Sequence, residues 1–281
     1  MPVVRSKDVR KITPLLQFLC VLLVSFTPVH SASDTTVVEP LHSAFEMKKI
    51  YLEYGDCDSF TTPCAWVKFE YPVFQSGLNK AILDSITLDI LLALNNYGYR
   101  ENTISNPDSL EQPEAVAKDY LDAEAVGFTD YPPLRGTNGY EHFQLNEISV
   151  EFETDSIITL RYKEGIANGG IHRYFTSYVV YHKRSGAKLD LPDILRAGYE
   201  DTLLAVGEAI FRKEQNLSSS KSFEKAGFHF AGDRFTLPAN FGVIKDSIVF
   251  WEDYFPIGQK LYSFIVVVPL SALGVYVRDD W

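Results

Sequence analysis

Basic side chains and long apolar runs are both scarce in this sequence of 281 residues. Its 26 Lys and Arg stand against 37 Asp and Glu, which gives a formal net charge of −11 at pH 7. Affinity for nucleic acids comes mainly from clustered Lys and Arg, so this balance argues against nucleic acid as a partner. Hydrophobic residues make up 46% of the chain. That fraction excludes a disordered protein, because so much apolar surface can offset the conformational entropy lost on folding.

Recognisable catalytic and cofactor motifs are also missing. The sequence contains no GxSxG nucleophile elbow, no P-loop and no GxGxxG after an expected strand. Beyond residue 31 no two histidines stand in an HExxH motif or at the helical i, i+4 spacing; they are His42, His142, His172, His182 and His229. We therefore expect neither a metal site nor a cofactor, and the sequence favours a protein that is not an enzyme.

The N-terminal 31 residues have the pattern of a secretory signal peptide. Basic residues between Arg5 and Lys11 precede an apolar core at residues 15–26, and small residues follow Pro28. This core is well short of the roughly 20 residues that cross a bilayer as a helix. We expect export to the periplasm or the extracellular space and no membrane span after removal of the signal.

Removal of this leader changes both the charge and the cysteine count. Cleavage is expected after Ser31 or Ser33, and the alternative is an uncleaved anchor over residues 12–29. The exported part then keeps 22 basic and 36 acidic side chains, a net charge of −14. Cys20 leaves with the leader. It lies inside the apolar core rather than at its end, which argues against a lipid-attachment cysteine.

Cys57 and Cys64 are the two cysteines that remain in the exported part. Disulfides form and persist in exported proteins, and the turn-rich residues 58–63 allow the two Cα atoms to approach. A metal site is the alternative, but two cysteines without a nearby histidine make only half a ligand set. The sequence therefore predicts a Cys57–Cys64 disulfide that closes a short hairpin.

The first half of the exported chain is predicted to form this hairpin and then two helices. Alternating apolar residues on both sides of the cysteines indicate two strands, and Pro72 should end the second. Apolar residues then recur at every fourth position over 78–94, which predicts a helix over 76–97 with Ser76 as its N-cap. A second helix is expected over 113–125.

From residue 140 onward apolar and polar residues alternate with a period of two. Strands are expected at 148–152 and 158–162 around a tight turn, and at 172–182 after a break in the ladder at 165–170. The further elements expected are a helix at 199–213, strands at 235–237, 247–251 and 260–268, and a short helix at 269–273. Strands outnumber helices, so the predicted fold class is α+β, an antiparallel sheet with a few helices packed on it.

Several motifs in the second half resemble the DUF3298 family. Residues 168–172 (NGGIH), an aromatic strand and residues 185–195 (SGAKLDLPDIL) are similar, in order, to its GGAH, TGK and LxDLF signals. Segments between residues 237 and 273, including NF at 240–241, resemble its later motifs. The cysteine hairpin and the long helix are similar to the DUF4163 region that commonly precedes this domain. The resemblance covers about residues 46–275.

The resemblance implies an exported bacterial α+β domain associated with the cell wall. Relatives in the family include the extracytoplasmic part of a lysozyme-binding anti-sigma factor and the accessory region of a peptidoglycan deacetylase. This chain departs from the pattern at 255–257, where the family usually has PYE, and at Arg173, where Pro often follows the histidine. No segment resembles a sigma-binding helix or a deacetylase domain, so regulation by cleavage and catalysis do not carry over.

The expected organisation has four parts. A signal peptide (1–31) and a flexible tether (32–44) precede a DUF4163-like part (45–145) and a DUF3298-like part (146–281). The last two parts are expected to form one compact unit.

The first candidate ligand-binding residues are Asn168, Gly169, Gly170 and His172. The two glycines allow positive φ angles and close backbone approach, so backbone amides and the imidazole can meet a ligand there. A hairpin bend whose histidine contacts a neighbouring loop explains the same residues, and we favour that structural interpretation.

Trp251 and Tyr254 form the second candidate. Together with Phe255 they can make an aromatic recognition surface of the kind that dominates many interfaces. Packing of the same rings in the core is the favoured alternative.

The acidity of the exported part has two explanations, which are attraction of a basic partner and solubility. A charge of −14 favours a basic partner, because complementary charge speeds association. The leading hypothesis is an exported, non-catalytic binding module for a cell-wall component, such as a peptidoglycan fragment, or for a basic wall-active protein such as lysozyme. The alternative is a cell-envelope hydrolase that uses acidic pairs such as Glu151 with Glu153 or Glu252 with Asp253.

Overall fold

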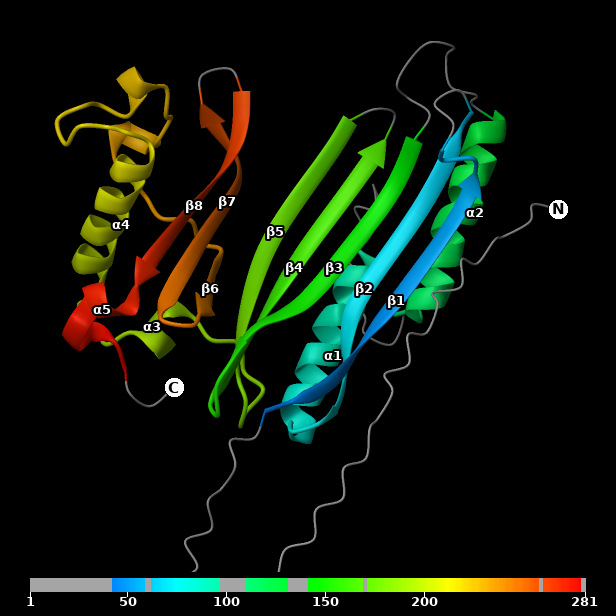
Figure 1. The fold of residues 1–281 in the computed structure, drawn as a ribbon, viewed down its shortest axis with the longest axis horizontal. Helices are drawn as coiled ribbons and strands as arrows, with labels where there is room; N and C mark the ends of the chain where they lie inside the picture. Colours follow the sequence, from blue (N-terminus) through cyan, green and yellow to red (C-terminus); the bar gives the residue numbers. More distant parts are fainter. Residues whose placement is uncertain are drawn as a thin grey trace, which may run out of the picture.

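Two β-sheets stand side by side in the computed structural model, in which β5 of the larger sheet neighbours the smaller one (Figure 1). The structure describes residues 42–58, 62–96, 110–130, 141–168, 171–257 and 260–278, so the expected signal peptide and most of the expected tether lie outside the described residues. The strand orders are β1-β2-β3-β4-β5 and β6-β7-β8. The predicted α+β class is confirmed.

The five-stranded sheet begins with the predicted hairpin. Its strands are β1 (Ala44–Gly55), β2 (Cys64–Ser76), β3 (Glu141–Glu153), β4 (Ile157–Asn168) and β5 (Ile171–His182). The Cys57–Cys64 disulfide closes β1 and β2, with the two Cα atoms 5.2 Å apart. β2 and β3 run parallel, so this sheet is mixed. A parallel pair needs a long crossover, and the segment between these strands contains two helices.

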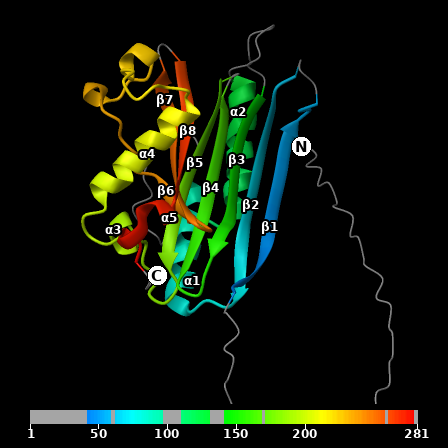
Figure 2. The same cartoon turned by 60° about the vertical axis from the view of Figure 1, so that its left-hand side comes forward.

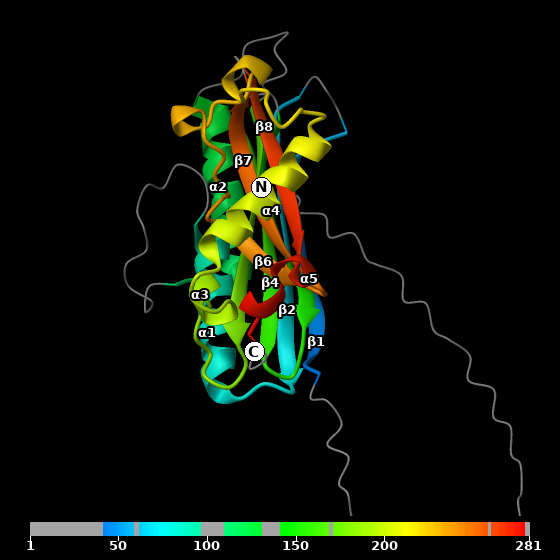
Figure 3. The ribbon, with the colours of Figure 1, turned by 90° about the vertical axis from the view of Figure 1, so that its left-hand side faces the viewer.

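Helices α1 (Lys80–Asn95) and α2 (Pro113–Asp130) cover one face of this sheet, here called the inner face (Figures 1 and 3). α1 begins later than predicted. Ser76 still belongs to β2, where it pairs with Ala44. The N-cap is Asn79, whose Oδ1 accepts hydrogen bonds from the backbone N–H groups of Ala81 and Ile82 at 2.9 and 3.3 Å.

Pro72 does not end β2, contrary to the prediction. It pairs with Met47 of β1, and β2 continues to Ser76. On its other side β2 pairs with β3 only from Cys64 to Glu70. At Pro72 the strand therefore has one neighbour, and proline is tolerated at such an edge of a sheet.

The predicted break in the ladder at 165–170 is also wrong for residues 165–168. β4 pairs with β5 as far as Asn168, opposite Ile171. Gly165 serves close packing instead, because a Cβ atom there would lie 2.9 Å from the ring of Tyr174. Gly169 and Gly170 lie outside the described residues.

The second half adds a smaller, wholly antiparallel sheet with α4 packed on it (Figure 2). Its elements are α3 (Leu191–Ile194), α4 (Glu200–Glu214), the short 3₁₀ helices η2 (Glu224–Ala226) and η3 (Ala231–Asp233), β6 (Phe241–Ile244), β7 (Ser247–Ile257), β8 (Lys260–Pro269), α5 (Leu270–Leu273) and η4 (Gly274–Tyr276). The strand predicted at 235–237 is absent. Phe235 is instead buried against the ring of Phe211, 5.2 Å away between centroids.

Two large hydrophobic cores and a small third cluster of Phe143, Leu145 and Ala167 result among the described residues. The first core lies on the inner face between the sheet and α1 and α2, and the second lies around α4 and the smaller sheet. A β-bulge between Val150 and Phe152 reverses the alternation of β3, so Val150 packs on the first core and Phe152 on the second. The two sheets approach closely at Gly242 of β6, where a Cβ would come within 2.7 Å of the Tyr178 ring of β5.

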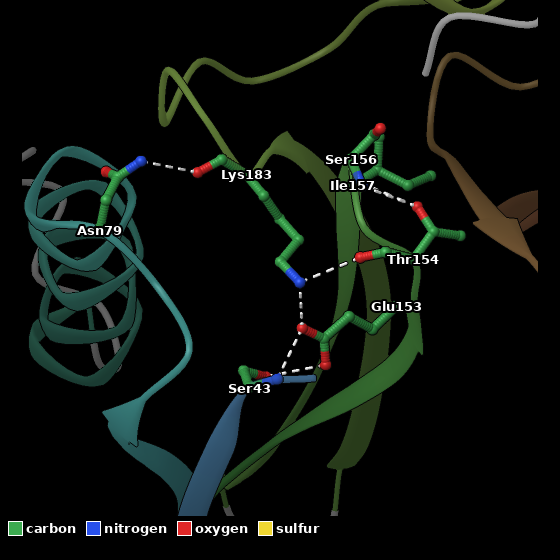
Figure 4. A network of polar contacts seen from close by, with 7 residues as sticks. All are labelled: Ser43, Asn79, Glu153, Thr154, Ser156, Ile157 and Lys183. Carbon is green, nitrogen blue, oxygen red and sulfur yellow. Dashed lines mark hydrogen bonds and ion pairs between the residues drawn. The ribbon is translucent and has the colours of Figure 1, made fainter. Parts of the chain in front are cut away.

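A buried ion pair ties three chain segments together at one end of the larger sheet (Figure 4). Lys183 Nζ lies 2.7 Å from Glu153 Oε1 and donates to the carbonyl of Thr154 at 3.0 Å. The same carboxylate accepts from the backbone N–H and the hydroxyl of Ser43 at 2.9 and 2.8 Å. Asn79 donates to the carbonyl of Lys183 at 3.1 Å, which attaches α1 to this network.

Within the described ranges, no helix has the length and apolarity needed to cross a membrane. Among the same residues, no group of three or more His, Cys, Asp or Glu side chains is arranged to hold a metal ion.

Candidate functional site

A cavity of about 550 Å³ lies where β4 and β5 of the larger sheet meet β7 of the smaller one. It combines carboxylates with aromatic rings and small polar side chains. Its lining residues are Tyr162, Glu164, Phe175, Thr176, Ser177, Ala239, Asn240, Trp251, Glu252 and Asp253. None of these lining residues is Lys, Arg or His, so the described wall of the cavity carries negative charge only.

The alternation of β4 places a carboxylate at the floor of this cavity. Ile158, Leu160 and Tyr162 face the inner side and are buried in the first core. Glu164 is the next residue in that phase, beyond the part of the face that α1 and α2 cover, and it pairs in register with Phe175 of β5. The inward-facing side chains before it in β4 are buried in the first core, whereas Glu164 presents a carboxylate to the cavity.

Side chains of the smaller sheet hydrogen-bond to the free backbone edge of β5 and form the opposite wall. Asn240 accepts from the N–H of Tyr178 at 2.9 Å and donates to the carbonyl of Thr176 at 2.6 Å. Asp253 accepts from the N–H of Thr176 at 2.6 Å and from Trp251 Nε1 at 2.9 Å. These contacts fix the position of Trp251 and occupy both carboxylate oxygens of Asp253.

Burial shifts the acidity of the two glutamates. It raises the pKa of the Glu164 carboxyl. It also raises the pKa of Glu252, with a smaller contribution from the neighbouring charge of Asp253. Within the described residues the side chain of Glu164 has neither a hydrogen bond nor an ion pair, and burial is the cause of its pKa shift. Buried polar groups are normally paired, so unpaired ones mark a place where a ligand would complete the contacts.

Tyr162 forms a rigid part of the wall. Its hydroxyl lies 3.3 Å from that of Tyr181, which donates to Asp89 of α1, and Lys188 completes the chain 2.9 Å from Asp89. Burial raises the pKa of both tyrosines, so both hydroxyls stay protonated and hold the ring of Tyr162 in place.

The structure places the predicted site residues apart. Trp251 lines the cavity. Tyr254 belongs to β7, but its side chain lies outside the described residues. Asn168 ends β4 and its side chain is likewise not described. His172 lies on the outer face of the larger sheet, where its side chain is 43% exposed and Nε2 lies 3.7 Å from Glu141 Oε2.

Glu164 was not predicted from the sequence, although a signal exists. It is a charged residue at a position where the alternation of β4 requires an inward-facing, apolar one. Asn240 was part of the segment that resembles DUF3298. Nothing in its local pattern indicates that its side-chain amide makes the hydrogen bonds to β5 that a neighbouring strand would otherwise make. Glu252 and Asp253 were predicted as a pair, and both line the cavity.

The class that this architecture defines is an α+β domain with a mixed five-stranded sheet, a three-stranded sheet and an acidic cavity between them. Two crystal structures of DUF3298 family proteins share the fold. One, from Bacteroides fragilis, is 18% identical with a TM-score of 0.58, and the match covers 85% of this chain and 95% of that one. The other, from Pseudomonas aeruginosa, is 15% identical with a TM-score of 0.54, and covers 85% and 97%.

The sequence itself matches no family model and no curated protein. The resemblance to DUF3298 seen in the sequence motifs is thus confirmed at the level of the fold.

Proposed function

We propose that this protein is an exported, non-catalytic binding module that receives a cationic group in the cavity beside β5. The group belongs to a cell-wall component, such as the free amine of a peptidoglycan fragment, or to a basic wall-active protein such as lysozyme. The observation that carries the proposal is the unpaired, partly buried carboxylate of Glu164 in a cavity whose described lining has no cation.

Electrostatics favours a cationic ligand in this cavity. An ammonium or guanidinium group beside Glu164 would supply the opposite charge that the carboxylate lacks, and it would lower the raised pKa. The ring of Trp251 offers an additional cation–π contact. The net charge of −14 expected for the exported part would attract the same partner over longer distances.

The expectation of export rests on two features. The first is the basic and apolar pattern of residues 1–31. The second is the Cys57–Cys64 disulfide, because such bonds persist in oxidising compartments.

The test is calorimetric titration of the purified protein with lysozyme and, separately, with a muropeptide that has a free amino group. Glu164→Gln should weaken binding about tenfold, which corresponds to about 1.4 kcal/mol. Glu214→Gln is the matched control, since it removes the same charge from an exposed position at the end of α4. Equal affinities for the wild type and the Glu164→Gln variant would refute a role for the cavity.

A hydrolase that uses carboxylates is the second candidate, and the raised pKa of Glu164 favours it because a general acid must stay protonated. Such a hydrolase also needs a second carboxylate as nucleophile or base, and Asp253 of the same cavity is poorly suited to that role. Both oxygens of Asp253 already accept hydrogen bonds from Thr176 and Trp251, which weakens it as a nucleophile or base. Mass spectrometry of peptidoglycan fragments after incubation at several pH values separates the two functions, because a binding module leaves every fragment unchanged.

A further inference from the structure

A row of aromatic side chains crosses the outer face of the larger sheet, opposite the face that α1 and α2 cover. The row follows the order of the strands, from β1 through β2 and β3 to β5. Its members are Tyr51, Trp66, Phe143, His172 and Tyr174, and they are called the aromatic row here. Tyr51 is 42% exposed and Tyr174 47% exposed, so both ends of the row reach solvent.

The rings support one another across the strands. Trp66 stacks on Phe143 with centroids 4.4 Å apart and an angle of 14° between the planes. Tyr51 stacks beside Trp66 at 6.3 Å, and His172 meets Phe143 edge-on at 5.3 Å. Phe143 is buried beneath its neighbours, whereas the others present ring surface. The row is therefore an ordered surface held by the sheet.

Carboxylates surround the row at the β1 and β2 end. Glu141 accepts from Trp66 Nε1 at 2.8 Å, and Glu53 accepts from the hydroxyl of Tyr51 at 2.8 Å. Burial raises the pKa of Tyr51 to about 12, and the charges of Glu53, Asp58 and Glu141 add to this shift. The rings thus lie in a locally negative potential.

The neighbouring cations on this face are already paired with other carboxylates. Lys49 lies 2.6 Å from Glu70, and Lys68 lies 2.5 Å from Glu147. Within the described part of the chain Glu53 and Asp58 have no ion pair, and Glu141 has only the His172 contact at 3.7 Å. The acidic groups beside the row are therefore left for a cation from outside.

We propose that the aromatic row is a docking surface for an extended, arginine-bearing segment of a basic protein. A guanidinium group stacks on aromatic faces and pairs with carboxylates in the same plane, and both features are present here. Four interstrand spacings give the row a width of about 19 Å, which an extended segment of about six residues spans. A second copy of this chain does not fit, because two exported parts each carrying −14 repel.

This surface lies on the other face of the sheet from the cavity, so it acts whether or not the cavity is occupied. The probe is an acetylated peptide of four Arg-Ser repeats, titrated calorimetrically at low and at moderate salt. The double variant Tyr51→Ala with Glu141→Gln removes one ring and one carboxylate at partly exposed positions. It should weaken binding at least about tenfold. A peptide of four Lys-Ser repeats should bind the wild type several-fold more weakly than the arginine peptide.

The control variant Phe45→Ala with Glu46→Gln makes the same two changes at the far end of β1, where both side chains are exposed. It should bind the peptide within about twofold of the wild type. Circular dichroism confirms that each variant is folded.

Three results overturn the inference. One is equal binding by the wild type and by the Tyr51→Ala, Glu141→Gln variant. Another is loss of peptide binding in Glu164→Gln alone, which places the peptide in the cavity and supports the proposed function instead. The third is binding of a neutral chitooligosaccharide, but not of the arginine peptide, that depends on Tyr51, which makes the row a glycan surface.

Discussion

The two large hydrophobic cores among the described residues are built from different kinds of side chain. The first core is largely aliphatic on its helical side, where Ile82, Ile86, Ile90 and Leu94 of α1 face the sheet. The second is dominated by phenylalanine and gathers much of the irregular chain between α4 and β6. Regular periodicity organises the first core, whereas a cluster of rings organises the second.

Phe211 of α4 is the centre of the second core. It is fully buried and lies 5.0–6.0 Å, between ring centroids, from five other phenylalanines. Those partners are Phe223, Phe228, Phe230, Phe235 and Phe264. Four of the five lie in the segment between α4 and β6, which has only two short 3₁₀ helices of its own. One side chain therefore contacts four rings of a long segment that has little regular secondary structure.

Phe211→Ala is expected to have the largest effect on stability. Removing the central ring should cost about 4 kcal/mol of the free energy of unfolding, because a cavity remains where five rings converged. Ile86→Ala is the matched change in the first core and should cost about 3 kcal/mol. Urea denaturation followed by circular dichroism measures both. A loss below about 1 kcal/mol for Phe211→Ala would mean that the rings repack and that the cluster has no centre.

Lys183→Ala should have the next largest effect on stability. It tests whether the first core also depends on the buried ion pair between Lys183 and Glu153. The side chains of Lys183 and Glu153 are 6% and 9% exposed, so loss of the lysine leaves a buried carboxylate whose remaining hydrogen bonds, among the described residues, come from Ser43. The expected cost is about 3 kcal/mol. Replacing both partners, as Lys183→Met with Glu153→Leu, should cost less than the single change. A double variant with a lower free energy of unfolding than Lys183→Ala would contradict this explanation.

The difference between the cores explains what could be predicted from the sequence. The apolar residues of α1 recur at every fourth position, so this helix was predicted, with an error of a few residues at its start. At 235–237 a single Thr between Phe and Leu imitates the alternation of a strand, yet contacts with distant rings determine the backbone there. The parallel pairing of β2 with β3 was not predicted, because it depends on where the crossover returns.

Asn79→Ala should have a smaller effect on the first core. The cap accepts two backbone hydrogen bonds of α1 and donates to the carbonyls of Lys183 and Arg184. Its loss should cost about 1 kcal/mol. Asn79→Asp retains the acceptor but not the donor, so thermal denaturation of both variants separates capping from the link to β5. An equal loss of thermal stability in both variants would assign the effect to the hydrogen bonds that Asn79 donates to the carbonyls of Lys183 and Arg184.

Glu164→Gln should have the smallest effect on stability. Unlike the other variants, it should raise the free energy of unfolding at neutral pH. Burial raises the folded-state pKa of Glu164 above its unfolded value, so the wild type loses stability as pH rises through that raised pKa. At pH 7 the variant should therefore be the more stable of the two proteins. Below the ordinary carboxyl pKa the two should converge. Melting temperatures across pH 3 to 8 measure this difference, and a wild type that stays the more stable at pH 7 would show that Glu164 has a stabilising partner.

The candidate site was predictable only in part, for a related physical reason. Trp251 was a candidate because aromatic residues favour recognition surfaces, although packing in the core was the favoured interpretation, and the structure places it in the lining of the cavity. Glu164 has the opposite local context, since it lies in a strand whose other inward positions are apolar. The walls of the cavity come from β4, β5, β7 and the segment before β6, and only the packing of the two sheets brings these together.

The way in which the two sheets meet also bears on self-association. A free strand edge is a template on which another chain can add a strand, and so it is a starting point for fibrils. On β5 the amide of Asn240 and the carboxylate of Asp253 occupy backbone hydrogen-bonding groups of Thr176 and Tyr178 that such a strand would need. The opposite edge, β1, carries the exposed charges of Glu46, Lys48 and Lys49. One edge of the larger sheet is thus covered by side chains at Thr176 and Tyr178 and the other carries exposed charge, so both edges disfavour the addition of a further strand.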